Sequence, residues 1–199
     1  ALPIFTDGTI DAHALDHFIH DAYKEAGVKR SDIDSGAVIL TGEAIKRKNA
    51  RAIDELFADQ AGKFVCATAG HKLECTLAAH GSGAVALSKQ RQNVVLHVDI
   101  GGGTTKLALI EKGIIKSVSA FAVGGRLVAQ DGKGEWTRVD QSAWMVAQDL
   151  GLETDKKTLT DPAVRQKIAT RLAVLAVDQI MGGPTDKLGR DLELTDPLD

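Results

Sequence analysis

Apolar and polar residues in the first part of the chain follow the pattern of helices that alternate with short buried strands. Some segments have apolar positions at helical spacing, whereas others are short apolar runs bounded by glycine or polar residues. The predicted elements are a helix over 11–26, a strand over 37–41, a helix over about 43–58, a strand over 63–68 and a helix over about 73–81. Strands separated by helices imply a parallel βαβα segment with helical crossovers.

From residue 93 the pattern changes to closely spaced strands. Apolar runs at 94–100, 104–110 and 114–123 are joined by short turns, which predicts an antiparallel three-stranded β-meander. The segments expected after it are a helix that begins at Arg126, a charged excursion over 131–138, helices over 141–150 and 161–180, and a loop or weak strand over 182–199. The chain is therefore expected to be α/β, with one part over 1–92 and a second over 93–199.

The turn between the first two meander strands carries the strongest chemical signal. It reads Asp-Ile-Gly-Gly-Gly-Thr-Thr over 99–105. Because glycine has no Cβ, the backbone amides of 101–105 can approach phosphate oxygens closely. Asp99, at the strand end, is placed to hold a hydrated divalent cation beside those phosphates. We interpret the turn as a nucleotide-phosphate site, with a hairpin turn that has surplus glycine as the alternative.

Two other glycine-rich phosphate loops do not fit the same residues. The segment lacks the lysine and the serine or threonine of a G-x-x-x-x-G-K-[ST] loop, and it lacks G-x-G-x-x-G spacing that runs into a helix. After the glycines, Leu107 and Leu109 alternate with Lys106 and Ala108, which is typical of a strand. The turn is therefore predicted to join the two strands of a β-hairpin.

Composition and charge exclude several classes of protein. The chain has 199 residues, is 44% hydrophobic and carries a formal net charge of −3, so it can bury one good core or two small ones. Acids and bases are interspersed without a basic stripe, so no nucleic-acid partner is expected. No apolar run approaches the roughly 20 residues of a membrane span, and no signal peptide is recognisable. A cytoplasmic protein without a membrane partner is expected, and two cysteines are too few for a disulfide framework.

Two clusters of histidine or cysteine have short spacings that raise the question of a metal site. They are Cys66, His71, Cys75 and His80, and His13, His17 and His20 on one face of the first helix. The first cluster departs from the usual C-x-x-C or H-x-x-x-H spacing, and a solvated helix face explains the second. Neither cluster is predicted to bind a metal.

Three segments together resemble the actin-like ATPase superfamily, which includes actin, the heat-shock 70 chaperones and the sugar kinases. They are Glu-Cys-Thr-Leu-Ala-Ala-His-Gly over 74–81, the glycine turn over 99–104, and Val-Gly-Gly over 123–125. The family often has proline where this chain has Cys75. The resemblance implies an actin-like (ribonuclease H-like) ATPase fold, with the end of the first lobe over 1–92 and the start of the second over 93–199. An earlier D-x-G-[ST]-x hairpin and a late glycine-rich adenosine loop are not recognised in the sequence, so an incomplete fold is expected.

A closer resemblance is to the ethanolamine utilisation family whose members reactivate ethanolamine ammonia-lyase. The residues that carry it include Thr-Gly-Glu over 41–43, Asn-Ala-Arg over 49–51, Ala-Thr-Ala-Gly over 67–70, His-Gly-Ser-Gly-Ala over 80–84 and Gly-Gly-Arg-Leu over 124–127. This resemblance implies a chaperone-like factor that uses ATP and Mg²⁺ to release damaged cobalamin from the adenosylcobalamin-dependent lyase. It implies the lyase and a nucleotide as partners and leaves a homo-oligomer open. It places the protein in the cytoplasm, beside or inside the ethanolamine bacterial microcompartment.

The superfamily resemblance also assigns roles to particular residues. Glu74 and Asp99 are the candidate catalytic acids: Glu74 occupies the position of an acid that orients or activates the attacking water, and Asp99 contacts Mg²⁺ through water. The candidates for binding the phosphates and the rest of the nucleotide are Gly101, Gly102, Gly103, Thr104, Thr105, Gly124 and Gly125. The alternatives left open are an exposed helix-start carboxylate at Glu74, a cap of the glycine turn at Asp99 and a helix-entry turn at 124–125.

Two other functions remain as alternatives. An actin-like filament or scaffold component would use nucleotide only as an assembly switch. A small-molecule kinase would need a sugar or acid site between the lobes, and no clear one is visible in the sequence.

Overall fold

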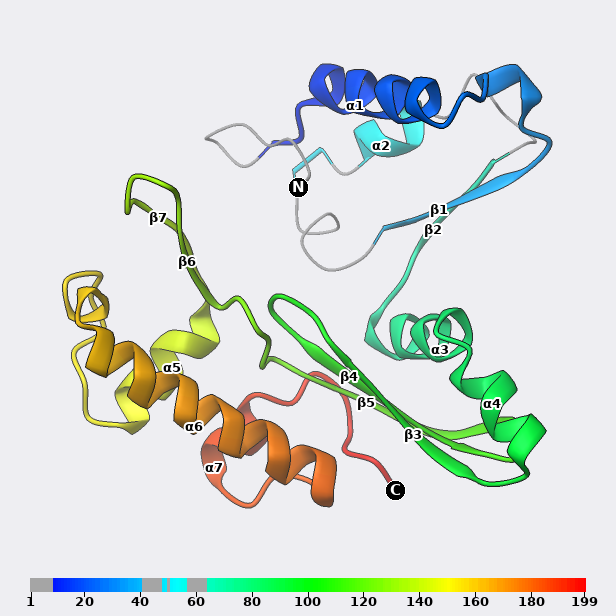
Figure 1. Ribbon diagram of the computed structural model, residues 1–199. Coiled ribbons are helices and arrows are strands. Elements are labelled where there is room, and N and C mark those ends of the chain that lie inside the picture. The colour runs from blue at the N-terminus through cyan, green and yellow to red at the C-terminus, as the bar shows by residue number, and fades with distance from the viewer. Residues whose placement is uncertain (1–8, 41–47, 50, 57–63) are drawn as a thin grey trace. The chain divides into compact units, whose positions relative to one another are not determined.

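The chain divides into two compact units, residues 1–70 and residues 71–199 (Figure 1). The computed structural model describes residues 9–40, 48–49, 51–56 and 64–199. The Thr-Gly-Glu motif and most of the helix predicted over 43–58 lie outside these residues. Each unit is described below by itself.

The first unit contains the parallel strand pair that the sequence predicts. Its elements are α1 (Ala12–Glu25), a short 3-10 helix η1 (Arg30–Asp32), β1 (Gly36–Leu40), α2 (Arg51–Leu56) and β2 (Phe64–Thr68). Strand β1 pairs with β2 in parallel, with Gly36 opposite Phe64 and Leu40 opposite Thr68. Asp11 caps α1 by accepting a hydrogen bond from the Ala14 amide.

The described core of this unit is small and combines residues from α1, β1, α2 and the segment before α1. Its buried side chains are Ile10, Leu15, Leu40 and Ile53. The side-chain amide of Asn49 holds the first described segment in place: its Oδ1 accepts from the Ile10 amide at 2.7 Å, and its Nδ2 donates to the Ile10 carbonyl at 3.0 Å. Asn49 of the Asn-Ala-Arg motif therefore has a structural role at the start of α1.

The second unit is built on the predicted antiparallel meander. Helices α3 (His71–Gly81) and α4 (Ala84–Arg91) precede β3 (Val94–Ile100), β4 (Thr105–Glu111) and β5 (Ile114–Phe121), and the strand order is β3-β4-β5. Both strand pairs are antiparallel, as expected from the sequence. Helix α4 was not expected; it is separated from α3 by Gly83, whose φ is +80°.

The meander has two faces with different coverings, as Figure 1 shows for the second unit. On one face, α3 and α4 pack over Ala108 and Ile110. On the other face, Leu107 and Phe121 enter the larger core with the helices that follow. These helices are α5 (Gln141–Asp149), the 3-10 helix η3 (Thr158–Thr160), α6 (Pro162–Met181) and α7 (Lys187–Asp191). On this second face the edge strand β3 carries apolar side chains that remain exposed, with Val94 and Ile100 at 60%.

The helix predicted to begin at Arg126 is wrong. A hairpin of β6 (Val128–Gln130) and β7 (Trp136–Val139) follows instead. The amide of Gly125 donates to the Gly101 carbonyl and that of Arg126 to the Gly102 carbonyl, at 2.9 and 2.8 Å. These bonds hold the loop against the glycine turn, and the chain continues into β6 instead of a helix.

The C-terminal tail is helical in part and pairs weakly with β5. Besides α7, which was not expected, the tail forms an antiparallel bridge between Phe121 and Glu193. The Ala122 amide also donates to the Leu192 carbonyl at 2.8 Å. The expected weak strand is therefore present over a few residues only.

The lobe boundary predicted between residues 92 and 93 stays a prediction. Helices α3 and α4 lie before that boundary in the sequence, yet they pack on the meander within the second unit. Among the described helices, none combines the length and the apolar character needed to cross a membrane.

Candidate functional site at the glycine turn

The turn between β3 and β4 is tight and leaves several backbone donors without partners. The Gly101 amide donates to the Thr104 carbonyl at 2.9 Å, which closes the turn. Within the described part of the chain, the amides of Gly102, Gly103 and Thr104 have no acceptor. Consecutive amides of this kind form a concave site that suits an anion. The geometry therefore offers donors where the sequence predicted phosphate binding.

The glycine pair at 124–125 lies directly against this turn. A β-carbon at Gly124 would lie 2.6 Å from the carbonyl oxygen of Gly102 and 2.7 Å from the nitrogen of Gly103. Only glycine allows two backbones to approach this closely. The structure thus brings Gly124 and Gly125 to the predicted site, and the alternative of a helix-entry turn is wrong because no helix starts there.

The two threonines of the turn have different environments. Thr105 is fully buried, and its hydroxyl donates to the Val123 carbonyl at 2.7 Å, so it ties the hairpin to the loop that carries the glycine pair. The Thr104 hydroxyl, partly exposed, accepts a hydrogen bond from the ammonium of Lys106 at 3.1 Å. Contact of either residue with phosphate stays a prediction.

Lys106 is a residue of the site that the sequence analysis missed. Its Nζ lies 3.1 Å from Oε1 of Glu74, and the two side chains are only 8% and 20% exposed. Helix α3 supplies Glu74 and β4 supplies Lys106, so the pair joins helix and hairpin beside the turn. Glu74 is therefore not the exposed helix-start carboxylate of the alternative interpretation. A role for Glu74 in orienting water stays a prediction.

Asp99 lies opposite Lys106 in the β3–β4 ladder, so both side chains emerge on the same face of the sheet. The carboxylate is partly buried, and no described residue donates a hydrogen bond or forms an ion pair with it. The turn amides do not bond to it, which leaves the capping alternative without support. A carboxylate without a partner in the described structure, next to the glycine turn, fits a hydrated Mg²⁺, which prefers oxygen ligands and keeps several waters.

A second charged pair lies at the end of the β6–β7 hairpin and reaches the glycine turn. Arg138 on β7 donates from Nε and Nη2 to the two carboxylate oxygens of Asp140, at 2.7 and 2.6 Å. A β-carbon at Gly103 would lie 2.5 Å from Nη2 of Arg138. The guanidinium therefore occupies the space beside the turn that a side chain at Gly103 would fill. Sequence spacing gives no signal for this contact, because β6 and β7 were not recognised as a hairpin.

A cavity of about 560 Å³ adjoins the glycine pair on the side facing α6. Residues from the hairpin and the loop, such as Thr105 and Gly125, line one side of it. Apolar residues of α6, such as Leu172 and Ile180, line the other side. Its wall is mostly apolar, so it can accommodate an uncharged or aromatic group next to the donors of the turn.

The histidine and cysteine clusters have no metal-binding arrangement in the described residues. Within them, no group of three or more His, Cys, Asp or Glu side chains is placed to hold a metal ion. Cys75 is fully buried and donates to the Ser119 carbonyl at 3.3 Å, and burial raises the pKa of its thiol. The rings of His13 and His17 meet edge to face at 4.6 Å. The side chain of Cys66 is not among those that the structure describes.

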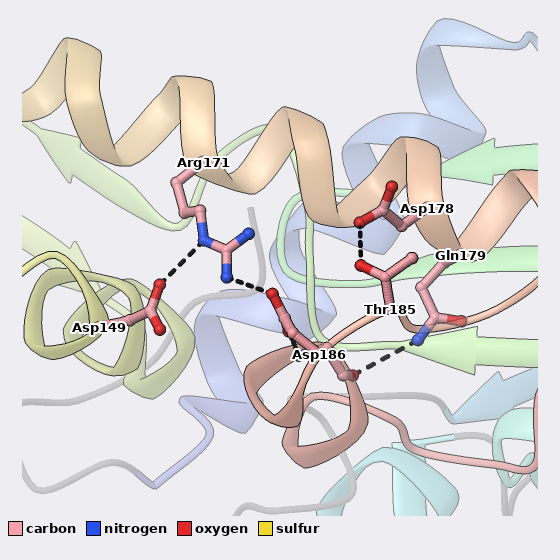
Figure 2. Close-up of polar contacts among 7 residues, drawn as sticks. Asp149, Arg171, Asp178, Gln179, Thr185 and Asp186 are labelled. Atoms are coloured by element: carbon pink, nitrogen blue, oxygen red, sulfur yellow. Dashed lines mark hydrogen bonds and ion pairs between the residues drawn. The ribbon is translucent and has the colours of Figure 1, made fainter.

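A third polar cluster, shown in Figure 2, ties three helices together away from the turn. Arg171 on α6 donates to Asp149 on α5 at 2.9 Å and to Asp186, the N-cap of α7, at 2.5 Å. These hydrogen bonds raise the pKa of Arg171. The Gly189 amide and the Arg171 guanidinium hold the pKa of Asp186 below its ordinary value. Two nearby contacts join Thr185 to Asp178 at 2.7 Å and Gln179 to the Gly189 carbonyl at 3.4 Å.

The meander, its glycine turn and the adjoining cavity define the second unit as a mixed α/β domain with a candidate anion site at a β-hairpin. Comparison with known families identifies the chain more closely. The family model described as "Ethanolamine utilisation protein EutA" matches residues 1–199, and the chain belongs to this family.

Two curated relatives are similar to the chain over most of its length. Both are named "Ethanolamine ammonia-lyase reactivase EutA", one from Salmonella typhimurium (strain LT2) and one from Escherichia coli (strain K12). Each is 38% identical over 181 residues, which cover 90% of this chain and 38% of the relative. The chain therefore spans about two fifths of the length of these relatives.

Two solved structures show a weaker likeness. One is the ethanolamine utilization protein EutJ from Carboxydothermus hydrogenoformans, with 20% identity, a TM-score of 0.35, and coverage of 89% of this chain and 56% of that chain. The other is MreB5 of Spiroplasma citri bound to ADP, with 22% identity, a TM-score of 0.33, and coverage of 60% and 34%. TM-scores this low do not identify a shared fold.

Proposed function

We propose that this chain is part of an ATP-dependent factor that reactivates ethanolamine ammonia-lyase, and that its glycine turn binds the phosphates of the nucleotide. The match to the EutA family over residues 1–199 carries the proposal. It is supported by the two relatives, each named as a reactivase of this lyase. The partners in this proposal are the lyase and a nucleotide, and the process is the release of damaged cobalamin at the ethanolamine microcompartment.

The arrangement proposed is that of an actin-like ATPase in which the β3–β4 hairpin opens the second lobe. Residues 1–92 would then end the first lobe and residues 93–199 would start the second. The parallel pair β1–β2 and the antiparallel meander are consistent with this order of elements. The nucleotide would lie at the glycine turn, with its uncharged part toward the apolar cavity.

Particular side chains take particular parts in this proposal. The amides of Gly102, Gly103 and Thr104 would donate to phosphate oxygens, and Gly124 keeps the turn in shape. Asp99 would hold Mg²⁺ through water; the ion would neutralise phosphate charge. Glu74 would orient the attacking water. Before a nucleotide binds, the ion pair with Lys106 fixes the position of the Glu74 carboxylate.

The proposal is tested first by calorimetric titration of Mg-ATP and Mg-ADP into this chain. We expect binding that Asp99→Asn weakens about tenfold or more, because the negative charge that holds the hydrated cation is lost. Glu153→Gln removes the same charge from an exposed side chain and should leave the affinity unchanged. No binding by the unmodified chain, or equal binding by the Asp99 variant, would contradict the assignment of the site.

The activity itself requires the full-length protein and inactivated lyase. With ATP present, the full-length protein should restore turnover of lyase that holds damaged cobalamin, and Asp99→Asn should abolish the recovery. Recovery that survives this substitution would separate the reactivase function from the glycine turn.

A further inference from the structure

We propose that Arg138 is a phosphate-binding residue of the glycine turn and that Asp140 positions its guanidinium for this contact. The inference rests on the phosphate-binding role proposed above for the turn. It adds a full positive charge to a site that was otherwise described by backbone donors and a cation.

The first observation is how closely Arg138 approaches the turn. A β-carbon at Gly103 would lie 2.5 Å from its Nη2, and one at Gly102 would lie 3.4 Å from its Nη1. Any side chain at Gly103 would therefore displace the guanidinium. Because Gly102 and Gly103 have no side chains, the guanidinium can lie against the turn and an anion can approach the same backbone.

The second observation is that Asp140 fixes the orientation of the guanidinium. The two side chains form a fork, Nε to Oδ1 at 2.7 Å and Nη2 to Oδ2 at 2.6 Å. Asp140 is itself anchored, because its amide donates to the Leu127 carbonyl at 2.8 Å. A planar guanidinium held in this way loses little conformational entropy when it contacts an anion.

The third observation is that this pair is neither buried nor fully solvated. The side chains of Arg138 and Asp140 are 32% and 28% exposed, so a ligand at the turn can reach the guanidinium. The turn amides of Gly102 and Gly103, which lack acceptors in the described structure, lie beside it. Backbone amides carry partial charges only, and the charge of a phosphate group is balanced better when a guanidinium joins them.

The charge of Arg138 is balanced by Asp140, and the same guanidinium can also contact a ligand at the turn. Before a ligand binds, Asp140 balances the charge of Arg138. A phosphate at the turn would share the guanidinium with that carboxylate. Removing the Asp140 carboxylate ends this competition for the guanidinium, and we expect this gain to exceed the loss of orientation. Phosphate binding should then strengthen, and only while Arg138 is present.

The test is titration calorimetry of inorganic pyrophosphate and of Mg-ADP into this chain. We expect Arg138→Gln to weaken both about tenfold. Arg91→Gln is the matched control, since it removes the same charge from an exposed position just before the start of β3, at the opposite end of that strand from the turn. Equal affinity of the Arg138 variant and the unmodified chain, or tighter binding by the variant, would overturn the proposal.

A double-mutant cycle separates a direct role from general electrostatics. Asp140→Asn should tighten pyrophosphate binding severalfold, but it should have no effect when combined with Arg138→Gln. The same gain in both backgrounds would mean that Asp140 acts on the ligand independently of the arginine. Arg138→Lys, which keeps the charge and loses the fork, should bind with intermediate affinity, and thermal unfolding of each variant checks that the fold is kept.

The proposed function and this inference fail in different ways. If the unmodified chain binds Mg-ADP and Asp99→Asn weakens it while Arg138→Gln does not, only the inference on Arg138 is overturned. If the unmodified chain binds neither Mg-ADP nor pyrophosphate, both are overturned together.

Discussion

Arg138 and Arg171 use the same chemistry in two regions of the second unit, with different surroundings. Arg138 forms a fork of two hydrogen bonds with Asp140, beside turn amides that lack acceptors in the described structure. Arg171 contacts two carboxylates, Asp149 and Asp186, each on a different element (Figure 2). One guanidinium between two aspartates leaves excess negative charge, which repels an anion. The neighbouring backbone donors therefore distinguish Arg138, a candidate binding residue, from Arg171, whose role is structural.

Several substitutions test the difference between these two regions. The largest effect is expected at Gly124, which lies against the glycine turn beside Arg138. Gly124→Ala would place a methyl group against the Gly102 carbonyl, and this overpacking against backbone should lower the free energy of unfolding by about 3 kcal/mol. Nucleotide binding should be lost with it, because the turn must move. Urea unfolding and calorimetry measure the two effects.

Gly132→Ala is the control for that substitution. A β-carbon at Gly132 would have no atom within 4 Å, so the variant should unfold and bind like the unmodified chain. Equal behaviour of the two alanine variants would mean that the close contact at Gly124 is not required.

Arg171→Met should lower stability and leave binding unchanged. Loss of two charge-assisted hydrogen bonds at a partly exposed position should reduce the free energy of unfolding by about 2 kcal/mol. Lys187→Met, which removes an exposed ion pair with Asp191, should cost about 0.5 kcal/mol or less. Urea unfolding measures the loss of stability. A changed affinity for Mg-ADP in the Arg171 variant would contradict the assignment of a purely structural role to Arg171 and a binding role to Arg138.

The smallest effect is the part of the pH dependence of stability that comes from Asp186, in the Arg171 cluster. The pKa of Asp186 is lower in the folded state than its ordinary value, so its contribution is present above the unfolded-state pKa, about 3.9. The contribution is lost as the pH falls through the lower folded-state pKa. Thermal unfolding between about pH 5 and pH 2 should therefore show a smaller acid-induced loss of stability in Asp186→Asn. Identical pH profiles for the two proteins would contradict the assignment.

The meander could be predicted because its signals are local. Alternating residues and short turns define each of its strands, and the glycine-rich turn lies within one hairpin. Helix α4 could not be predicted in this way because its buried residue is polar. Ser88 is fully buried, donates to the Asn93 carbonyl at 2.7 Å and accepts from the Gly113 amide at 3.2 Å. A helix that buries a serine shows no apolar stripe.

The charged part of the site escaped prediction for a related reason. In an alternating strand, Lys106 reads as a solvent-facing residue, yet it is buried against Glu74 of an earlier helix. Arg138 reaches Gly103 from a hairpin 35 residues further along the chain. Contacts between such distant residues depend on the packed fold and leave no trace in local periodicity.

The hydrogen bonds that hold the glycine turn have a mechanical consequence. Backbone bonds run from the carbonyls of Gly101 and Gly102 to residues 125 and 126, and from the Leu127 carbonyl to the amide of Asp140. Asp140 is the N-cap residue of α5, so a short series of backbone links joins the turn to the helical layer. We expect a displacement of the turn to shift the start of α5 as well, because these links join the two. The turn and the start of α5 are therefore rigidly connected. Any closure of the site around a ligand must move the turn and α5 together.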